Sequence, residues 1–93
     1  MKAIWLGTVI AESAEAVVVE GNHYFPLAAV NRDYLRDSAH TSVCSWKGTA
    51  NYFSISAGGA LNQDAACYYA DPKPEALQIK GRIAFWRGVK VVE

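Results

Sequence analysis

The residue types best suited to chemistry gather in one short segment, which carries a thiol, an indole and an ammonium group. These groups belong to Cys44, Trp46 and Lys47, just before Gly48. A thiolate is stabilised beside a cation, so Cys44 is a candidate nucleophile and Lys47 a candidate anchor for an anionic group. Free cysteine is also common in protein cores, so the alternative is that Cys44 and Trp46 share a buried face.

Two further polar candidates lie earlier in the chain. His23 stands at the end of an expected strand, where it acts as a general base that assists Cys44 or simply makes a local hydrogen bond. Arg32 can bind a carboxylate or phosphate through two parallel hydrogen bonds. Its alternative is an ion pair with a neighbouring acid: Asp33, Asp37 or Asp64.

The sequence gives little support for metal chemistry. Cys44 and Cys67 are far apart in the sequence, and only His23 and His40 add further nitrogen ligands. Zinc sites generally use closely spaced ligand pairs, which are missing from this pattern. We therefore expect no metal and no cofactor.

Composition indicates one globular domain that spans residues 1–93, with 52% hydrophobic and 19% charged residues. Nine basic and nine acidic residues cancel, which argues against binding of nucleic acid through phosphate neutralisation. No apolar run reaches the roughly 18 residues of a membrane span, and residues 1–6 lack the features of a secretory signal. We expect a cytoplasmic protein that is a monomer or a weak homodimer.

Short strands must position these candidates in the first part of the chain. Residues 3–10 and 16–20 are rich in β-branched and apolar side chains, and residues 23–25 follow a turn at Gly21 and Asn22. This pattern predicts strands that pair as a hairpin or meander. After Pro26, the apolar spacing predicts a short helix or 3₁₀ turns over residues 27–36.

The strand pattern returns in the second part of the chain. Gly58 and Gly59 are typical of a hairpin turn, and Arg87 and Gly88 predict a second turn between the last two strands. A helical turn is expected at residues 75–77, after a proline-flanked loop. The strands are expected at residues 41–46, 49–56, 65–70, 79–86 and 89–92. About seven or eight short strands predict a mainly β sandwich or barrel.

Several segments taken together resemble a known family. They are residues 1–20, 23–26, 44–52, 65–69 and 81–85. The combination of Cys-x-Trp-Lys-Gly with the later Tyr-Tyr and Ile-Ala-Phe segments is similar to domain-of-unknown-function family 427. The resemblance covers nearly the whole chain. It implies a β-tent-like sandwich or half-barrel, in which two antiparallel sheets are pinned near one edge.

The resemblance also bears on chemistry and on packing. Relatives with this architecture often hold zinc on two cysteine pairs, which this chain lacks, so the resemblance implies the fold without the metal. A nucleotidyltransferase-like label attaches to the family, but no Asp-x-Asp pair is present here to hold Mg²⁺. The chain differs from the typical pattern at Ser45 and Ala70, in place of prolines, and at Cys67, in place of a tryptophan. The small thiol should open space or require repacking.

We therefore expect a small-ligand binding module whose groove lies between the sheets. Aromatic side chains would line the groove, and two cations would fix an anionic or aromatic ligand. The expected ligand-binding residues are Tyr24, Arg32, Trp46, Lys47, Tyr52 and Tyr69. One alternative is an enzyme that depends on Cys44 or handles nucleotides. A second is a protein-interaction module that pairs through an exposed edge such as residues 89–92.

Overall fold

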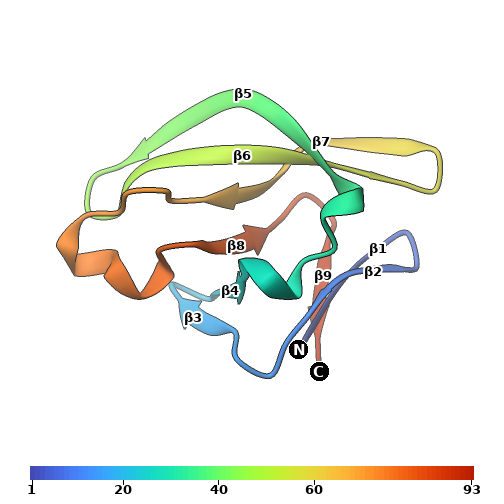
Figure 1. Ribbon diagram of the computed structural model, residues 1–93, viewed down its shortest axis with the longest axis horizontal. Coiled ribbons are helices and arrows are strands. Elements are labelled where there is room, and N and C mark those ends of the chain that lie inside the picture. The colour runs from blue at the N-terminus through green and yellow to red at the C-terminus, as the bar shows by residue number, and fades with distance from the viewer.

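The computed structural model describes residues 1–93 and contains nine β-strands and three 3₁₀ segments (Figure 1). The strands are β1 (Lys2–Trp5), β2 (Thr8–Glu12), β3 (Val17–Val19), β4 (Asn22–Pro26), β5 (Leu35–Cys44), β6 (Gly48–Ala57), β7 (Ala60–Tyr68), β8 (Arg82–Phe85) and β9 (Lys90–Val92). The 3₁₀ segments are η1 (Leu27–Ala29), η2 (Arg32–Tyr34) and η3 (Pro74–Ile79). None of the helical segments has the length and apolar character that a membrane-crossing helix requires.

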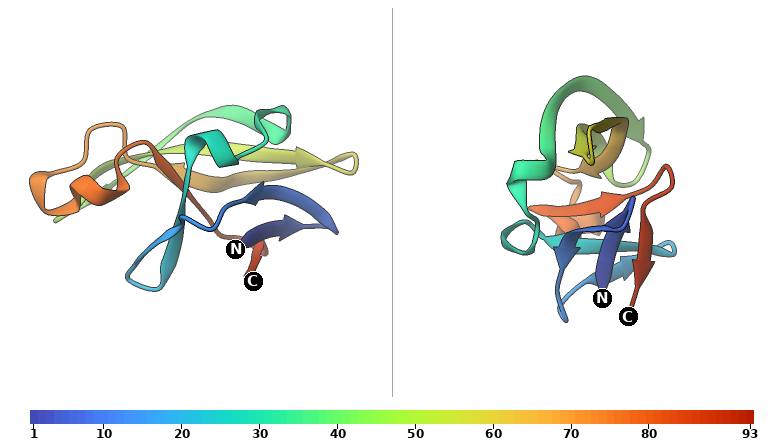
Figure 2. Two further views of the ribbon diagram at one scale, coloured as in Figure 1. Left: turned by 60° about the horizontal axis from the view of Figure 1, so that its bottom comes forward. Right: turned by 90° about the vertical axis from the view of Figure 1, so that its right-hand side faces the viewer.

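The strands form two antiparallel sheets, as the resemblance to the family implied. The small sheet has the order β2-β1-β9, and the large sheet has the order β3-β4-β8-β7-β6-β5. The small sheet lies against one face of the large sheet, which we call the inner face (Figure 2). The amide of Asn31 donates to the carbonyl of Ile10 at 2.9 Å, and Ala11 forms a bridge with Val30. These contacts hold η1 and η2 beside the small sheet.

Tight two-residue turns close the local hairpins. The turns are Leu6 with Gly7, Glu20 with Gly21, and Gly58 with Gly59, and all six residues have positive φ. This turn geometry matches the twist of paired strands, and glycine adopts it without steric cost. The β3–β4 and β6–β7 hairpins were predicted. The single strand expected over residues 3–10 is wrong, because the chain folds back at Leu6 and Gly7 to pair β1 with β2.

Two other expectations are wrong because distant partners decide the pairing. Residues 35–40 belong to β5, and residues 35–37 pair with β6, so the helical segment predicted over residues 27–36 ends at Tyr34. The last two strands do not form a hairpin. Strand β8 pairs with β4 and β7, whereas β9 pairs with β1 as an edge of the small sheet. The turn at Arg87 and Gly88 exists, but it carries the chain from one sheet to the other.

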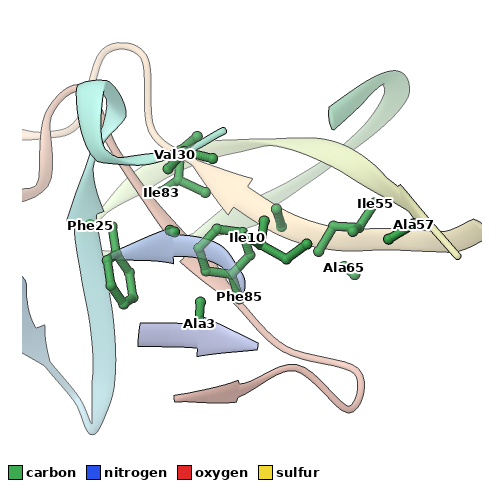
Figure 3. Packing of buried hydrophobic residues seen from close by; sticks show 11 residues of the cluster. Ala3, Ile10, Phe25, Val30, Ile55, Ala57, Ala65, Ile83 and Phe85 are labelled. Atoms are coloured by element: carbon green, nitrogen blue, oxygen red, sulfur yellow. The ribbon is translucent and has the colours of Figure 1, made fainter. Parts of the chain in front are cut away.

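The large sheet is covered on both faces. Alternation along its strands sends Phe25, Ile83 and Phe85 to the inner face and Tyr24 and Ala84 to the opposite, outer face. Figure 3 shows the inner cluster, where the Phe25 and Phe85 rings pack edge to face with centroids 5.8 Å apart. The small sheet covers this inner cluster, and η3 covers the outer one. The outer cluster consists of Val19, Tyr24, Ala50, Tyr69, Ala76, Ile79 and Ala84.

The β5–β6 pairing and the β6–β7 pairing each contain a register shift, and both shifts lie near Asp64. This residue has a φ of 57°. Its amide donates to the Ser54 hydroxyl at 3.0 Å, and its carboxylate accepts from the hydroxyl of Ser38. Its carbonyl accepts from the indole nitrogen of Trp86 at 2.6 Å. Asp64 therefore fastens β5, β6 and the end of β8 together, and it is not a partner of Arg32.

Candidate functional site

Most of the expected ligand-binding residues surround one buried ammonium group. Lys47 lies in the turn between β5 and β6 and is only 5% exposed. Its Nζ lies 5.4 Å from the centre of the Trp46 ring and 5.8 Å from the ring centres of Tyr24 and Tyr69. These distances are typical of cation–π contacts. Four of the six residues that were expected to line the groove, Tyr24, Trp46, Lys47 and Tyr69, therefore lie together.

A carboxylate that the sequence analysis missed completes this group. Nζ of Lys47 lies 2.7 Å from the carboxylate of Glu20 and donates to the Tyr24 hydroxyl at 3.4 Å. Glu20 sits in the β3–β4 turn, where its sequence context signals only a turn. The anion that Lys47 was expected to bind is therefore supplied by the chain itself. We call Glu20, Tyr24, Trp46, Lys47 and Tyr69 the Lys47 cluster.

The electrostatics of the Lys47 cluster fix its protonation state. Burial lowers the pKa of Lys47, but hydrogen bonds with Glu20 and Tyr24 outweigh this effect and leave the pKa above its ordinary value. The hydrogen bond from Lys47 holds the pKa of Glu20 below its usual range. Burial raises the pKa of Tyr24, and it raises the pKa of Tyr69 to about 12. None of these groups is tuned for proton transfer near neutral pH, so the cluster holds a fixed ammonium–carboxylate ion pair beside neutral phenols.

The segment before η3 holds the turn that carries Lys47. The amide of Lys73 donates to the carbonyl of Lys47 at 2.8 Å, and its ammonium donates to the carbonyl of Ser45 at 2.7 Å. Gly48 has a φ of 111°, and a Cβ there would lie 3.5 Å from the Lys73 nitrogen. These backbone contacts with Lys73 thus hold the turn in place, and they keep the Lys47 side chain among the rings of Tyr24, Trp46 and Tyr69.

Arg32 lies at a different site from Lys47, so the single groove expected from the sequence is wrong. It lines a cavity of about 330 Å³ on the inner face, which we call the Arg32 cavity. Strands β5 to β8 provide its floor, and η1 and η2 provide its wall. The lining residues are Leu27, Arg32, Leu35, Asp37, Phe53, Tyr68, Gly81 and Ile83.

The Arg32 cavity combines an aromatic floor with two charged side chains. The rings of Phe53 and Tyr68 stack with centroids 4.9 Å apart and planes inclined by 24°. Arg32 and Asp37 are exposed and lie within the same lining. The only ion pair in the protein joins Lys47 to Glu20. The guanidinium of Arg32 and the carboxylate of Asp37 are therefore free to meet a ligand.

Tyr52 lies outside both sites, beside a smaller hollow on the outer face. This cavity of about 170 Å³ is lined by Asn22, Tyr52, Cys67, Ala84, Phe85 and Trp86. Cys67 pairs in register with Tyr52 on one side and with Ala84 on the other. A small thiol and a methyl group thus lie side by side, which agrees with the expectation that Cys67 opens space.

The two catalytic candidates do not meet in the structure. Cys44 ends β5 and packs, partly buried, against the outer cluster, while His23 lies in β4 opposite Val18. No hydrogen bond joins Cys44 to His23 or to Lys47. Burial raises the pKa of the other thiol, Cys67. No group of three or more His, Cys, Asp or Glu side chains is arranged to hold a metal ion.

A comparison with models of protein families identifies a family that matches the chain. The family model described as a domain of unknown function (DUF427) matches residues 1–93. No curated protein matches the chain. The match covers the Lys47 cluster and the Arg32 cavity alike, and it assigns a chemical role to neither.

Proposed function

The chain belongs to the DUF427 family of domains of unknown function, and from its geometry we propose that it binds a small molecule in the Arg32 cavity. The ligand carries an anionic group, which Arg32 binds, and a flat apolar group, which lies on Phe53 and Tyr68. The observation that carries this proposal is an unpaired guanidinium at the edge of an aromatic floor.

The size of the cavity supports a ligand with a single ring system. Ligand pockets usually measure about 300–1,000 Å³, and an apolar cavity of about 150 Å³ is enough for benzene. The Arg32 cavity, at about 330 Å³, accommodates one ring with a charged substituent. Its lining is mostly apolar with few polar groups, a pattern typical of small-molecule sites.

Arg32 is better suited than Lys47 to bind an external anion. The ammonium of Lys47 is buried and already neutralised by Glu20 at 2.7 Å. An anion that approached Lys47 would have to displace this carboxylate. Arg32 has no such partner, and its planar guanidinium can bind a carboxylate or phosphate through two hydrogen bonds.

A thermal-shift screen tests the proposal with aromatic carboxylates, aryl phosphates and nucleotides. A ligand at 100 times its dissociation constant adds about 2.7 kcal/mol to the free energy of unfolding. In a domain of this size, each kcal/mol raises the midpoint by roughly 4–8 °C. We expect the shift to be lost in Arg32→Gln and retained in Arg87→Gln, a matched exposed arginine that stacks on Trp86 outside the cavity. A flat screen, or an equal shift in Arg32→Gln, contradicts the proposal.

A further inference from the structure

Resting on the ligand site proposed above, we infer that the Arg32 cavity selects zwitterions, and in particular α-amino acids with a flat apolar side chain. The inference adds a role for Asp37. From the sequence, Asp37 is expected only as an internal partner of Arg32. In the structure the two side chains line one cavity without forming an ion pair.

The position of Asp37 places its carboxylate at the border of the aromatic floor. Asp37 lies in β5 directly opposite Phe53 in β6, and the register shift of β5 begins immediately after it. Strand β5 is an edge of the large sheet, so no further strand lies beside it, and the Asp37 side chain is exposed. The nearby carboxylate of Asp64 is occupied by the hydroxyl of Ser38. Asp37 is thus the acidic group that remains available to a ligand in the cavity.

Two neighbouring arginines are engaged elsewhere. Arg36 directs its guanidinium to the carbonyls of Asp33 and Leu35, both at 2.8 Å. Arg82 donates to the carbonyl of Glu15 at 2.8 Å. Among the residues that line the cavity, the charged groups are one guanidinium, on Arg32, and one carboxylate, on Asp37.

This pair of opposite charges matches the head group of an amino acid. The α-carboxylate would meet Arg32 and the α-ammonium would meet Asp37, while the side chain lies on Phe53 and Tyr68. A ligand with only an anionic group gains from Arg32 but is repelled by Asp37. A ligand with only an ammonium group is repelled by Arg32. The cavity therefore discriminates through unfavourable as well as favourable contacts.

Titration calorimetry with three related probes tests the inference. L-Phenylalanine carries both charges, 3-phenylpropionate lacks the ammonium group, and phenethylamine lacks the carboxylate. We expect L-phenylalanine to bind at least about tenfold more tightly than either analogue, which corresponds to about 1.4 kcal/mol. Asp37→Asn should remove the advantage over 3-phenylpropionate. Asp33→Asn, a matched exposed aspartate outside the cavity lining, should keep it. Arg32→Gln should weaken the binding of L-phenylalanine and of 3-phenylpropionate to a similar extent, because both probes carry a carboxylate.

The outcomes separate this inference from the proposed function. If 3-phenylpropionate binds as tightly as L-phenylalanine and depends on Arg32, the ligand site stands but the selection of zwitterions is wrong. If Asp37→Asn binds L-phenylalanine as the unchanged protein does, Asp37 has no role in recognition. If L-phenylalanine does not bind, the inference is overturned, while an Arg32-dependent aryl phosphate in the wider screen would still support the site. Thermal midpoints of the variants verify that each one is folded.

Discussion

The ammonium of Lys47 lies 2.7 Å from the carboxylate of Glu20, in an ion pair whose two side chains are 7% and 56% exposed. Lys47 comes from the β5–β6 turn and Glu20 from the β3–β4 turn. Strands β3 and β5 are the two opposite edges of the large sheet. The ion pair therefore joins turns from opposite edges, which requires the sheet to curl around its outer cluster. This curl corresponds to the half-barrel that the sequence predicted.

The unequal burial of this ion pair predicts unequal effects of its two residues on stability. Glu20→Gln leaves a buried ammonium without a counter-charge. Lys47→Met keeps an unbranched stem among the three rings and leaves the Glu20 carboxylate in water, so its cost should be about 1 kcal/mol or less. We expect Glu20→Gln to lower the free energy of unfolding by more than Lys47→Met does, as measured by urea denaturation. Glu15→Gln, an exposed turn residue without an ion pair, is the control. A larger loss in Lys47→Met would show that the ring contacts matter more than the charge.

The same ion pair predicts how stability depends on acid pH. The pKa of Glu20 in the folded protein lies below its ordinary value of 4.5, so the unfolded chain takes up protons first as the pH falls. The stabilisation from Glu20 is present above the ordinary pKa and is lost as the pH falls through the folded pKa. The difference in unfolding free energy between the unchanged protein and Glu20→Gln should shrink toward low pH. Urea denaturation at a series of pH values measures it. A difference that is constant from about pH 7 to pH 3 would contradict this prediction.

The first hairpin turn contains a residue type poorly suited to its backbone. Leu6 has a φ of 49° and is 62% exposed. This conformation costs a leucine roughly 1–2 kcal/mol, whereas asparagine adopts it more readily. Leu6→Asn should therefore stabilise the protein by about 1 kcal/mol and raise the midpoint by roughly 4–8 °C in thermal unfolding. Leu61→Asn, which changes an equally exposed leucine in β7, should give no such increase. If both substitutions stabilise equally, the effect comes from lost apolar surface rather than from the turn.

The two thiols should differ in reactivity. Burial raises the pKa of Cys67, so its thiolate is scarce at neutral pH and access to it is restricted. In Cys44→Ser, we expect iodoacetamide to modify Cys67 only slowly until urea unfolds the protein. In Cys67→Ser, we expect Cys44 to react no faster than free cysteine, because Glu20 neutralises Lys47 and no histidine forms a hydrogen bond with Cys44. Faster reaction of Cys44 would support the alternative in which it is a catalytic nucleophile.

Local signals account for the parts of the fold that were predictable. Gly21 and the pair Gly58 and Gly59 mark hairpins because positive φ is a property of the turn residues themselves. Tyr24 and Phe25 are both at most 1% exposed, in keeping with the large apolar area that aromatic side chains bury. The turn at Arg87 and Gly88 carries the same signal, yet its flanking strands join different sheets. Whether β9 pairs with β8 or with β1 depends on residues distant in the sequence, which local patterns do not reveal.

The candidate site shows the same limit. Residue type singled out Trp46, Lys47, Tyr24 and Tyr69 as candidates, and the structure brings the three rings around the Lys47 ammonium. The separation of Arg32 from Lys47 was not predictable, because it depends on which face of the large sheet each segment packs against. Arg32 belongs to η2 on the inner face, whereas the Lys47 cluster belongs to the outer face.

The pairing of β1 with β9 has a consequence for the order of folding. Lys2 lies opposite Val92, so this ladder forms only after almost the whole chain has been brought into a closed loop. The local hairpins need no such closure. Contacts between distant segments form slowly, because the chain must lose conformational entropy before these contacts can stabilise it. The small sheet should therefore assemble after the β6–β7 hairpin. Substitutions in β9 should accelerate unfolding while leaving the refolding rate nearly unchanged.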